Sequence, residues 1–82
     1  YWRDKEKEID FLHINNDILP IEVKEAKKLR TDDLKPLLFF SKEYNIPKGI
    51  VVYNGEYEVS SGTMKIRKMP FWKFCIEQQE KE

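Results

Sequence analysis

Hydrophobic and polar residues alternate over two short stretches near the start of the chain. Residues 8–13 and 18–24 both follow this two-residue period, which is typical of β-strands because successive side chains of a strand point to opposite faces. The turn-forming residues 15–17 lie between them, so we predict a β-hairpin with a three-residue loop. A short aromatic stretch over residues 1–3 predicts one further strand before the hairpin.

The rest of the chain predicts a helix, more strands and a second helix. Apolar residues recur at helical spacing over residues 32–44. This helix must begin close to residues 31–33, because Pro36 is tolerated only in a first turn. The apolar, mostly β-branched run 50–53 is typical of a strand that is covered on both faces, and a helical crossover makes it parallel to the hairpin's second strand. Turn signals then separate two strands, over residues 56–60 and 64–68. A final helix follows over residues 71–78, with Pro70 suited to its first position.

The predicted fold class is therefore α/β, with a small mixed β-sheet, a β-hairpin, a crossover helix and a short C-terminal helix. Charged residues gather on one face of the hairpin. A three-residue loop sets Asp10 opposite Glu22 and Glu8 opposite Lys24. Two carboxylates on directly opposed residues, with Cβ atoms about 4.5–5.5 Å apart, repel each other unless a metal ion or the Lys24 ammonium lies between them.

The sequence leaves two alternatives for these residues. In one, Glu22 and Lys24 are exposed charges of the strand, and Asp10 pairs with Lys24 at the sheet surface. In the other, Asp10 and Glu22 bind Mg²⁺ or Mn²⁺, and the carbonyl of Val23 is a further ligand, because hard cations prefer oxygen. Lys24 would then position an attacking water molecule or neutralise a scissile phosphate, so the candidate catalytic residues are Asp10, Glu22 and Lys24.

Asp10 followed by the Glu22-Val23-Lys24 triplet resembles the signature of the PD-(D/E)xK nucleases. The resemblance implies a truncated restriction-endonuclease-like core and metal-dependent hydrolysis of DNA, with the two acids as ligands and the lysine as the catalytic cation. Active members usually take another acid from a helix before the first strand. This chain has no such helix, so we expect it not to cleave DNA by itself.

Residues 1–3, 8–11 and 19–24 together resemble the C-terminal domain of a family of prokaryotic AAA-type ATPases, which carries a nuclease-like module behind the ATPase. A looser similarity extends over residues 48–52 and 69–72. The resemblance implies that residues 1–82 are a single nuclease-like domain excised from the C-terminus of a larger ATPase. The ATPase portion of that parent chain is then an expected partner.

Basic residues on both sides of the predicted helix start are candidates for contact with DNA. Lys27, Lys28 and Arg30 directly follow the motif, and the nuclease resemblance adds Lys35, because superfamily members often have a basic residue in the next helix. A denser basic cluster is interleaved with aromatic residues further on and consists of Lys65, Arg67, Lys68 and Lys73. That cluster is either an edge that faces DNA or part of a surface whose aromatic residues serve packing, namely Phe71, Trp72 and Phe74.

Composition narrows the classes of function. Fifteen acids balance fifteen bases, which counts against tight autonomous DNA binding but leaves room for a local basic patch. The single cysteine, Cys75, excludes an intrachain disulfide and fits a cytoplasmic location. No apolar run approaches the roughly 20 residues of a membrane span, and no glycine-rich loop for ATP is present. Three classes stay open: a nuclease, a non-catalytic module that binds nucleic acid or protein or regulates the ATPase, and a purely structural domain.

Overall fold

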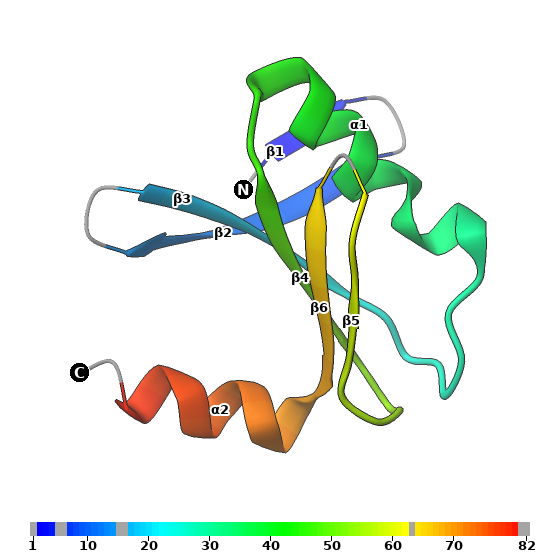
Figure 1. The fold of residues 1–82 in the computed structure, drawn as a ribbon, viewed down its shortest axis with the longest axis vertical. Helices are drawn as coiled ribbons and strands as arrows, with labels where there is room; N and C mark the ends of the chain where they lie inside the picture. Colours follow the sequence, from blue (N-terminus) through cyan, green and yellow to red (C-terminus); the bar gives the residue numbers. More distant parts are fainter. Residues whose placement is uncertain (1, 5–6, 15–16, 63, 81–82) are drawn as a thin grey trace.

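The computed structural model describes residues 2–4, 7–14, 17–62 and 64–80, and side chains over residues 18–62 and 64–79. The strands of this part of the chain are β1 (Trp2–Asp4), β2 (Lys7–Ile14), β3 (Asp17–Val23), β4 (Lys48–Tyr53), β5 (Glu58–Ser60) and β6 (Lys65–Pro70). The helices are a 3₁₀ turn, η1 (Thr31–Leu34), followed by α1 (Lys35–Tyr44) and α2 (Phe71–Glu80). The strands form one sheet in the order β1-β2-β3-β4-β6-β5 (Figure 1).

The α/β class, the mixed sheet, the crossover helix and the C-terminal helix are confirmed. α1 connects β3 to β4, and these strands are parallel, with Ile21 opposite Ile50. β6 is also parallel to β4, whereas β5 pairs with β6 in the antiparallel sense. The carboxyl ends of β3, β4 and β6 therefore meet at one edge of the sheet, which lies toward the bottom of Figure 1.

Two apolar clusters cover the two faces of β4, as its continuous apolar sequence predicts. Alternate residues of the strand belong to different clusters, because a strand presents successive side chains to opposite faces. On the face that α1 covers, here called the α1 face, the buried residues are Leu37, Phe40, Val51, Tyr53, Met64 and Ile66. On the other face, here called the α2 face, the buried residues are Ile21, Ile50, Val52 and Met69, with Phe74 of α2 packed against them.

The register of the hairpin differs by one residue from the prediction. Ile14 pairs with Asp17, and Asp10 pairs with Ile21 instead of Glu22. Two residues separate the paired ends, and a connection of this length is the commonest in hairpins. Since a slip of one residue exchanges the faces of a strand relative to its partner, the predicted direct opposition of Asp10 and Glu22 is wrong, as is that of Glu8 and Lys24.

Helix boundaries follow the two prolines closely. Pro36 lies in the first turn of α1, as predicted, and η1 precedes it. Pro70 is the last residue of β6, and α2 begins at Phe71, as predicted. The fixed φ of proline suits the end of a strand as well as the start of a helix. No helix in the described part of the chain combines the length and apolarity needed to cross a membrane.

Candidate nucleic-acid interface

Two adjoining cavities lie at the carboxyl edge of the parallel strands, where ligands commonly bind in open α/β sheets. Both cavities include Tyr53, the last residue of β4. The first, here called the basic cavity, has a volume of about 260 Å³ and is lined by Lys27, Lys28, Leu29, Tyr53, Glu58 and Lys68. The second, here called the aromatic cavity, has a volume of about 600 Å³ and is lined by Tyr53, Asn54, Gly55, Glu56, Tyr57, Pro70, Phe71, Trp72 and Lys73.

The lysines of the basic cavity come from two separate segments of the chain. Lys27 and Lys28 are exposed and follow β3, whereas Lys68 lies in β6, opposite Val51 on the α1 face. Glu58 of β5 is the one acid among the described lining residues, and it pairs with Lys68 in the sheet. Three ammonium groups against one carboxylate give this cavity a net positive charge at neutral pH.

Backbone contacts fix the segment that carries Lys27 against the end of β4. The N–H of Lys24 donates to the carbonyl of Val52 at 2.9 Å, and the N–H of Asn54 donates to the carbonyl of Ala26 at 2.8 Å. A Cβ atom on Gly55 would lie 2.7 Å from the carbonyl oxygen of Lys27 and would overlap the ring of Tyr53. Glycine therefore permits the close approach of the two segments at this point.

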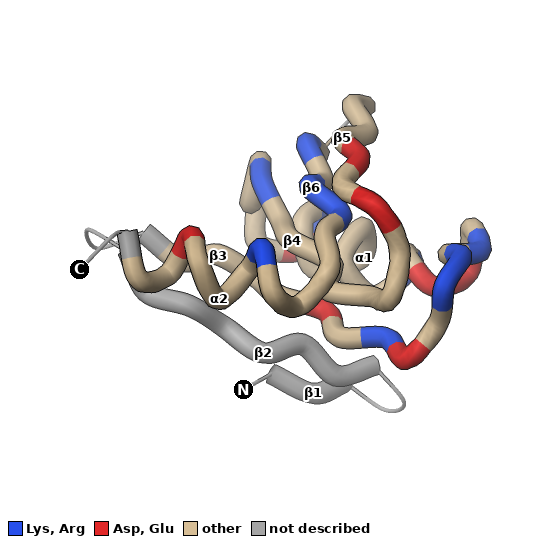
Figure 2. Tube along the Cα trace, turned by 90° about the horizontal axis from the view of Figure 1, so that it is seen from below, with Lys and Arg blue, Asp and Glu red and all other residues tan. Residues whose placement is uncertain are grey.

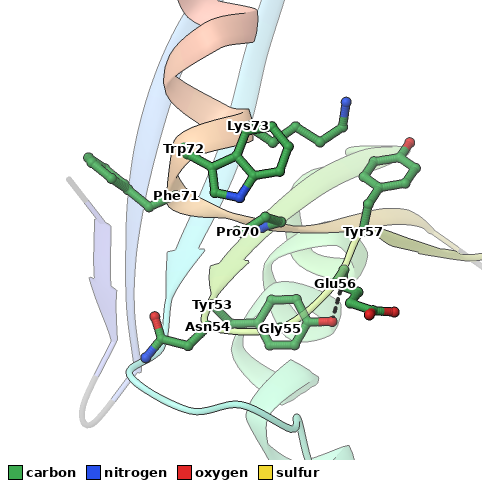
Figure 3. Close-up of a pocket in the computed structure, with 9 residues that line it drawn as sticks. All are labelled: Tyr53, Asn54, Gly55, Glu56, Tyr57, Pro70, Phe71, Trp72 and Lys73. Atoms are coloured by element: carbon green, nitrogen blue, oxygen red, sulfur yellow. Dashed lines mark hydrogen bonds between the residues drawn. The ribbon is translucent and has the colours of Figure 1, made fainter.

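Large aromatic rings line the aromatic cavity (Figure 3), which shares Tyr53 with the basic cavity. Phe71 and Trp72 are each 64% exposed, and Tyr57 is 44% exposed. The hydroxyl of Tyr53 donates to the carbonyl of Glu56 at 2.5 Å, and burial raises the pKa of Tyr53, which keeps the hydroxyl protonated. Exposed rings of this kind offer faces on which nucleic-acid bases can stack.

The structure brings together only part of the predicted basic residues. Lys27 and Lys28 share a cavity, but Arg30 and Lys35 line neither cavity. The backbone N–H of Arg30 donates to Asp33 Oδ2 at 2.8 Å, and the ammonium of Lys35 lies 2.9 Å from Asp32 Oδ1. These two residues therefore belong to the local structure of η1 and the start of α1.

The denser basic cluster is divided by the alternation of β6. Lys68 lies on the α1 face, whereas Lys65 and Arg67 lie on the α2 face, because residues two apart in a strand share a face. The aromatic residues divide in the same way: Phe74 packs against the core, while Phe71 and Trp72 are exposed. The packing alternative therefore holds for Phe74, whereas contact of this cluster with DNA stays a prediction.

The Glu-x-Lys triplet forms a compact charged cluster on the α1 face. Glu22 is buried and lies beside Val51, and Lys24 Nζ lies 3.6 Å from Glu22 Oε1. The same ammonium lies 4.0 Å from Asp33 Oδ1. Asp33 is not among the residues predicted for this site. Its approach to Lys24 depends on how residues 24–30 fold back, for which the sequence gives no signal. Val23, between the two charged residues, has an exposed side chain, and the side chain of Asp10 lies outside the described residues.

The donors described around Lys24 do not by themselves fit a Mg²⁺ or Mn²⁺ site. Glu22 and Asp33 are hard oxygen donors, but both flank an ammonium that already neutralises charge there. The described residues contain no group of three or more His, Cys, Asp or Glu that could hold a metal ion. The chemistry of this cluster, as far as its described side chains go, is that of a partly buried ion-pair network.

The fold and its carboxyl edge define a small α/β domain with a mixed sheet and an exposed surface that is both basic and aromatic. The chain belongs to the family described as Domain of unknown function (DUF4143), whose model matches residues 1–74. Comparisons with curated proteins and with solved structures found no match.

Proposed function

We propose that this domain is an accessory module of a AAA-type ATPase and binds the phosphodiester backbone of DNA at the carboxyl edge of its sheet. One observation carries the proposal: lysines from two segments line a single cavity that adjoins exposed aromatic rings. The link to an ATPase is supported by the resemblance of residues 1–3, 8–11 and 19–24 to the C-terminal domain of such proteins.

Two physical terms would contribute to this binding. Lysines that neutralise phosphates release counterions, which makes affinity depend on salt. Aromatic side chains stack with bases irrespective of sequence, and Trp72 would supply such a face for a single strand. Because the formal net charge of the chain is zero, the attraction is local to this edge, and we expect a Kd in the range of non-specific binding, about 10⁻⁴–10⁻⁶ M.

Fluorescence anisotropy with a labelled single-stranded oligonucleotide at low salt tests this proposal. Lys68→Gln should weaken binding about fivefold, which corresponds to the loss of ~1 kcal/mol from one exposed charged contact. Glu58→Gln should strengthen binding, because it removes the acid from the same cavity. Lys42→Gln is the matched control, since Lys42 is exposed in the last turn of α1, which leads to the amino end of β4. Equal affinities for all four proteins, or no binding at low salt, would contradict the proposal.

A second candidate function is metal-dependent hydrolysis of DNA by the intact parent protein. The observation that favours it is the closeness of Lys24 to Glu22 and Asp33 at the place where the nuclease resemblance requires a carboxylate and a lysine. Two described carboxylates do not complete a metal site, and the register pairs Asp10 with Ile21 of the α2 face, whereas Glu22 lies on the α1 face. This candidate therefore requires a different hairpin register in the parent protein, in which Asp10 joins Glu22 and the carbonyl of Val23.

Direct measurement of Mn²⁺ binding separates the two candidates. In the nuclease, Asp10→Ala abolishes Mn²⁺ binding, whereas Lys24→Ala abolishes DNA cleavage and leaves Mn²⁺ binding unchanged. Asp33→Asn shows whether the additional carboxylate contributes to metal binding. In the binding module, DNA affinity survives both Asp10→Ala and Lys24→Ala. Addition of Mn²⁺ then leaves the melting temperature unchanged and causes no cleavage of DNA.

A further inference from the structure

We propose that a third cavity, at the opposite edge of the parallel strands, binds a small ligand that carries a diphosphate group. This cavity, here called the amino-edge cavity, has a volume of about 320 Å³ and is lined by Leu19, Lys48, Gly49, Ile50, Lys65 and Arg67. Its residues come from the first halves of β3, β4 and β6, and all but Gly49 lie on the α2 face. It shares no described lining residue with the basic or the aromatic cavity.

The sheet register places two lysine residues side by side at this edge. Lys48 and Lys65 are direct partners in the parallel β4–β6 pair, where the strands are about 4.8 Å apart. Like charges on directly paired residues destabilise a sheet. Among the described side chains, neither ammonium lies within 4.0 Å of a carboxylate, and no acid lines the cavity. A bound anion that contacts both ammonium groups would remove this repulsion.

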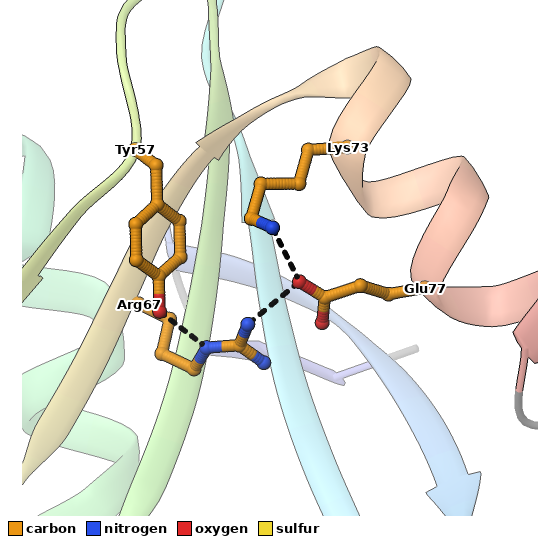
Figure 4. A network of polar contacts seen from close by, with 4 residues as sticks. All are labelled: Tyr57, Arg67, Lys73 and Glu77. Carbon is orange, nitrogen blue, oxygen red and sulfur yellow. Dashed lines mark hydrogen bonds and ion pairs between the residues drawn. The ribbon is translucent and has the colours of Figure 1, made fainter.

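Arg67 adds a third cation whose position is fixed by other residues. Its Nη2 lies 2.7 Å from Glu77 Oε2, and its Nε donates to the hydroxyl of Tyr57 at 3.1 Å (Figure 4). Lys73 Nζ lies 3.4 Å from the same carboxylate oxygen of Glu77. Two hydrogen bonds engage only part of a guanidinium, which has five N–H donors. Arg67 therefore lines the cavity with a guanidinium that Tyr57 and Glu77 hold in place and that keeps N–H donors for an anion.

Charge and size select the class of ligand. Figure 2, in which Lys and Arg are blue, shows basic segments on β6 and on α2. Two lysines and a partly neutralised arginine favour an anion with more than one negative charge. The volume lies at the small end of ligand pockets, which range over about 300–1,000 Å³. A diphosphate group satisfies both conditions, either as free pyrophosphate or as part of a nucleoside diphosphate.

Amide NMR of the ¹⁵N-labelled chain gives a readout that is specific for each cavity. Gly49 lines the amino-edge cavity and Gly55 lines the aromatic cavity. Titration with pyrophosphate at constant ionic strength should shift the Gly49 amide along a saturating curve and leave Gly55 almost unchanged. A parallel titration with ADP identifies the source: tighter binding than pyrophosphate indicates a nucleotide, and equal or weaker binding indicates the free anion.

Two charge reversals complete the test. Lys65→Glu should abolish the Gly49 response, whereas Lys27→Glu, at the opposite edge, should preserve it. Lys65→Glu should also raise the melting temperature of the ligand-free protein at low salt, because it replaces a like-charge pair by an opposite-charge pair. The proposal is overturned if Gly49 does not respond to millimolar pyrophosphate, or if Lys65→Glu binds it as the unchanged chain does. DNA binding at the carboxyl edge is independent of either result.

Discussion

At the scale of single residues, Lys24 is the most consequential charge in the structure. Its side chain is 36% exposed, whereas that of Glu22 beside it is 8% exposed. A buried carboxylate is costly when its cation is removed, because its desolvation is then less well compensated. The same ammonium also reaches Asp33, so it connects the end of β3 to η1.

Lys24→Met should therefore lower the free energy of unfolding by ~1–2 kcal/mol, as expected when a charged partner is removed from a buried group. Urea denaturation measures this change. Glu22→Gln combined with Lys24→Met should cost less than the sum of the two single variants, since the double variant buries no charge at this position. Strict additivity of the two losses would show that the ion pair contributes nothing.

Two glycines provide a matched pair of substitutions. A Cβ atom on Gly55 would contact the carbonyl oxygen of Lys27 and the ring of Tyr53, whereas a Cβ atom on Gly62 would have nothing within 4 Å. Gly55→Ala should lower the free energy of unfolding by ~1–3 kcal/mol through overpacking. Gly62→Ala should be neutral or slightly stabilising, because it reduces the entropy of the unfolded chain. Equal effects of the two substitutions on the unfolding midpoint would contradict the close packing described here.

At the scale of elements, α1 ends in a left-handed residue. Asn45 has φ 58°, and its N–H donates to the carbonyl of Ser41. The hydroxyl of Ser41 donates to the carbonyl of Ile46. In the opposite direction, the N–H of Ile46 donates to the carbonyl of Ser41 at 3.0 Å. This closed set of contacts ends the helix at Tyr44, and three residues separate it from the start of β4.

Asn45→Ala should destabilise the domain by ~1 kcal/mol, because a Cβ-bearing residue without a polar side chain is strained in the left-handed region. Asn45→Gly should be neutral or stabilising at the same position, since glycine favours this conformation. Thermal unfolding followed by circular dichroism compares the two variants. A loss of stability in Asn45→Gly as large as that in Asn45→Ala would contradict the strain argument.

The contact between α2 and β6 should depend on pH. The hydrogen bond from Arg67 is the main cause that holds the pKa of Glu77 below its ordinary value of about 4.5, with Lys73 acting in the same direction. Because the pKa is lower in the folded state, this carboxylate stabilises the fold above pH 4.5, and the contribution is lost as the pH falls through the folded value.

Glu77→Gln should therefore reduce the melting temperature at pH 7 and narrow its difference from the unchanged protein as the pH falls below about 4.5. Melting curves of the two proteins over the acidic range measure this difference. The two proteins share all other carboxyl groups, so the contributions of those groups largely cancel. A difference that is constant from pH 7 down to strongly acidic pH would exclude the ionised Glu77 as the cause.

The elements themselves could largely be predicted from the sequence, because their signals are local. Pro36 fixes the start of α1, and the apolar run of β4 requires cover on both faces. The register of the hairpin could not be predicted, since Asn15-Asn16-Asp17 suits a loop of either two or three residues, and one residue exchanges the faces of a strand.

The candidate site could be predicted only in part, because strand order and register decide which charged residues lie close together. Lys27 and Lys28 were selected by their place after the motif, and their proximity to Lys68 depends on strand order. The alternation of β6 was present in the sequence and would have separated Lys65 from Lys68. By contrast, the like-charge pair of Lys48 and Lys65 follows from the β4–β6 register, which only the structure supplies.

At the scale of the whole molecule, charge is arranged by edge while the net charge is zero. The basic cavity lies at the carboxyl ends of β3, β4 and β6, and the amino-edge cavity lies at the opposite ends of the same strands. α2 is held to β6 through Arg67 and places Trp72 beside the carboxyl edge. The sheet thus presents two separate positive surfaces, one of which is flanked by exposed aromatic rings.

The salt dependence of DNA binding tests the central claim most directly. The slope of log Kobs against log salt concentration counts neutralised phosphates, at about 0.7 per contact for a single strand. The combined variant Lys27→Gln, Lys28→Gln and Lys68→Gln removes all three ammonium groups of the basic cavity. The magnitude of the slope should then fall by about 2 relative to the unchanged chain. An identical slope for the two proteins would show that this cavity does not contact the DNA backbone.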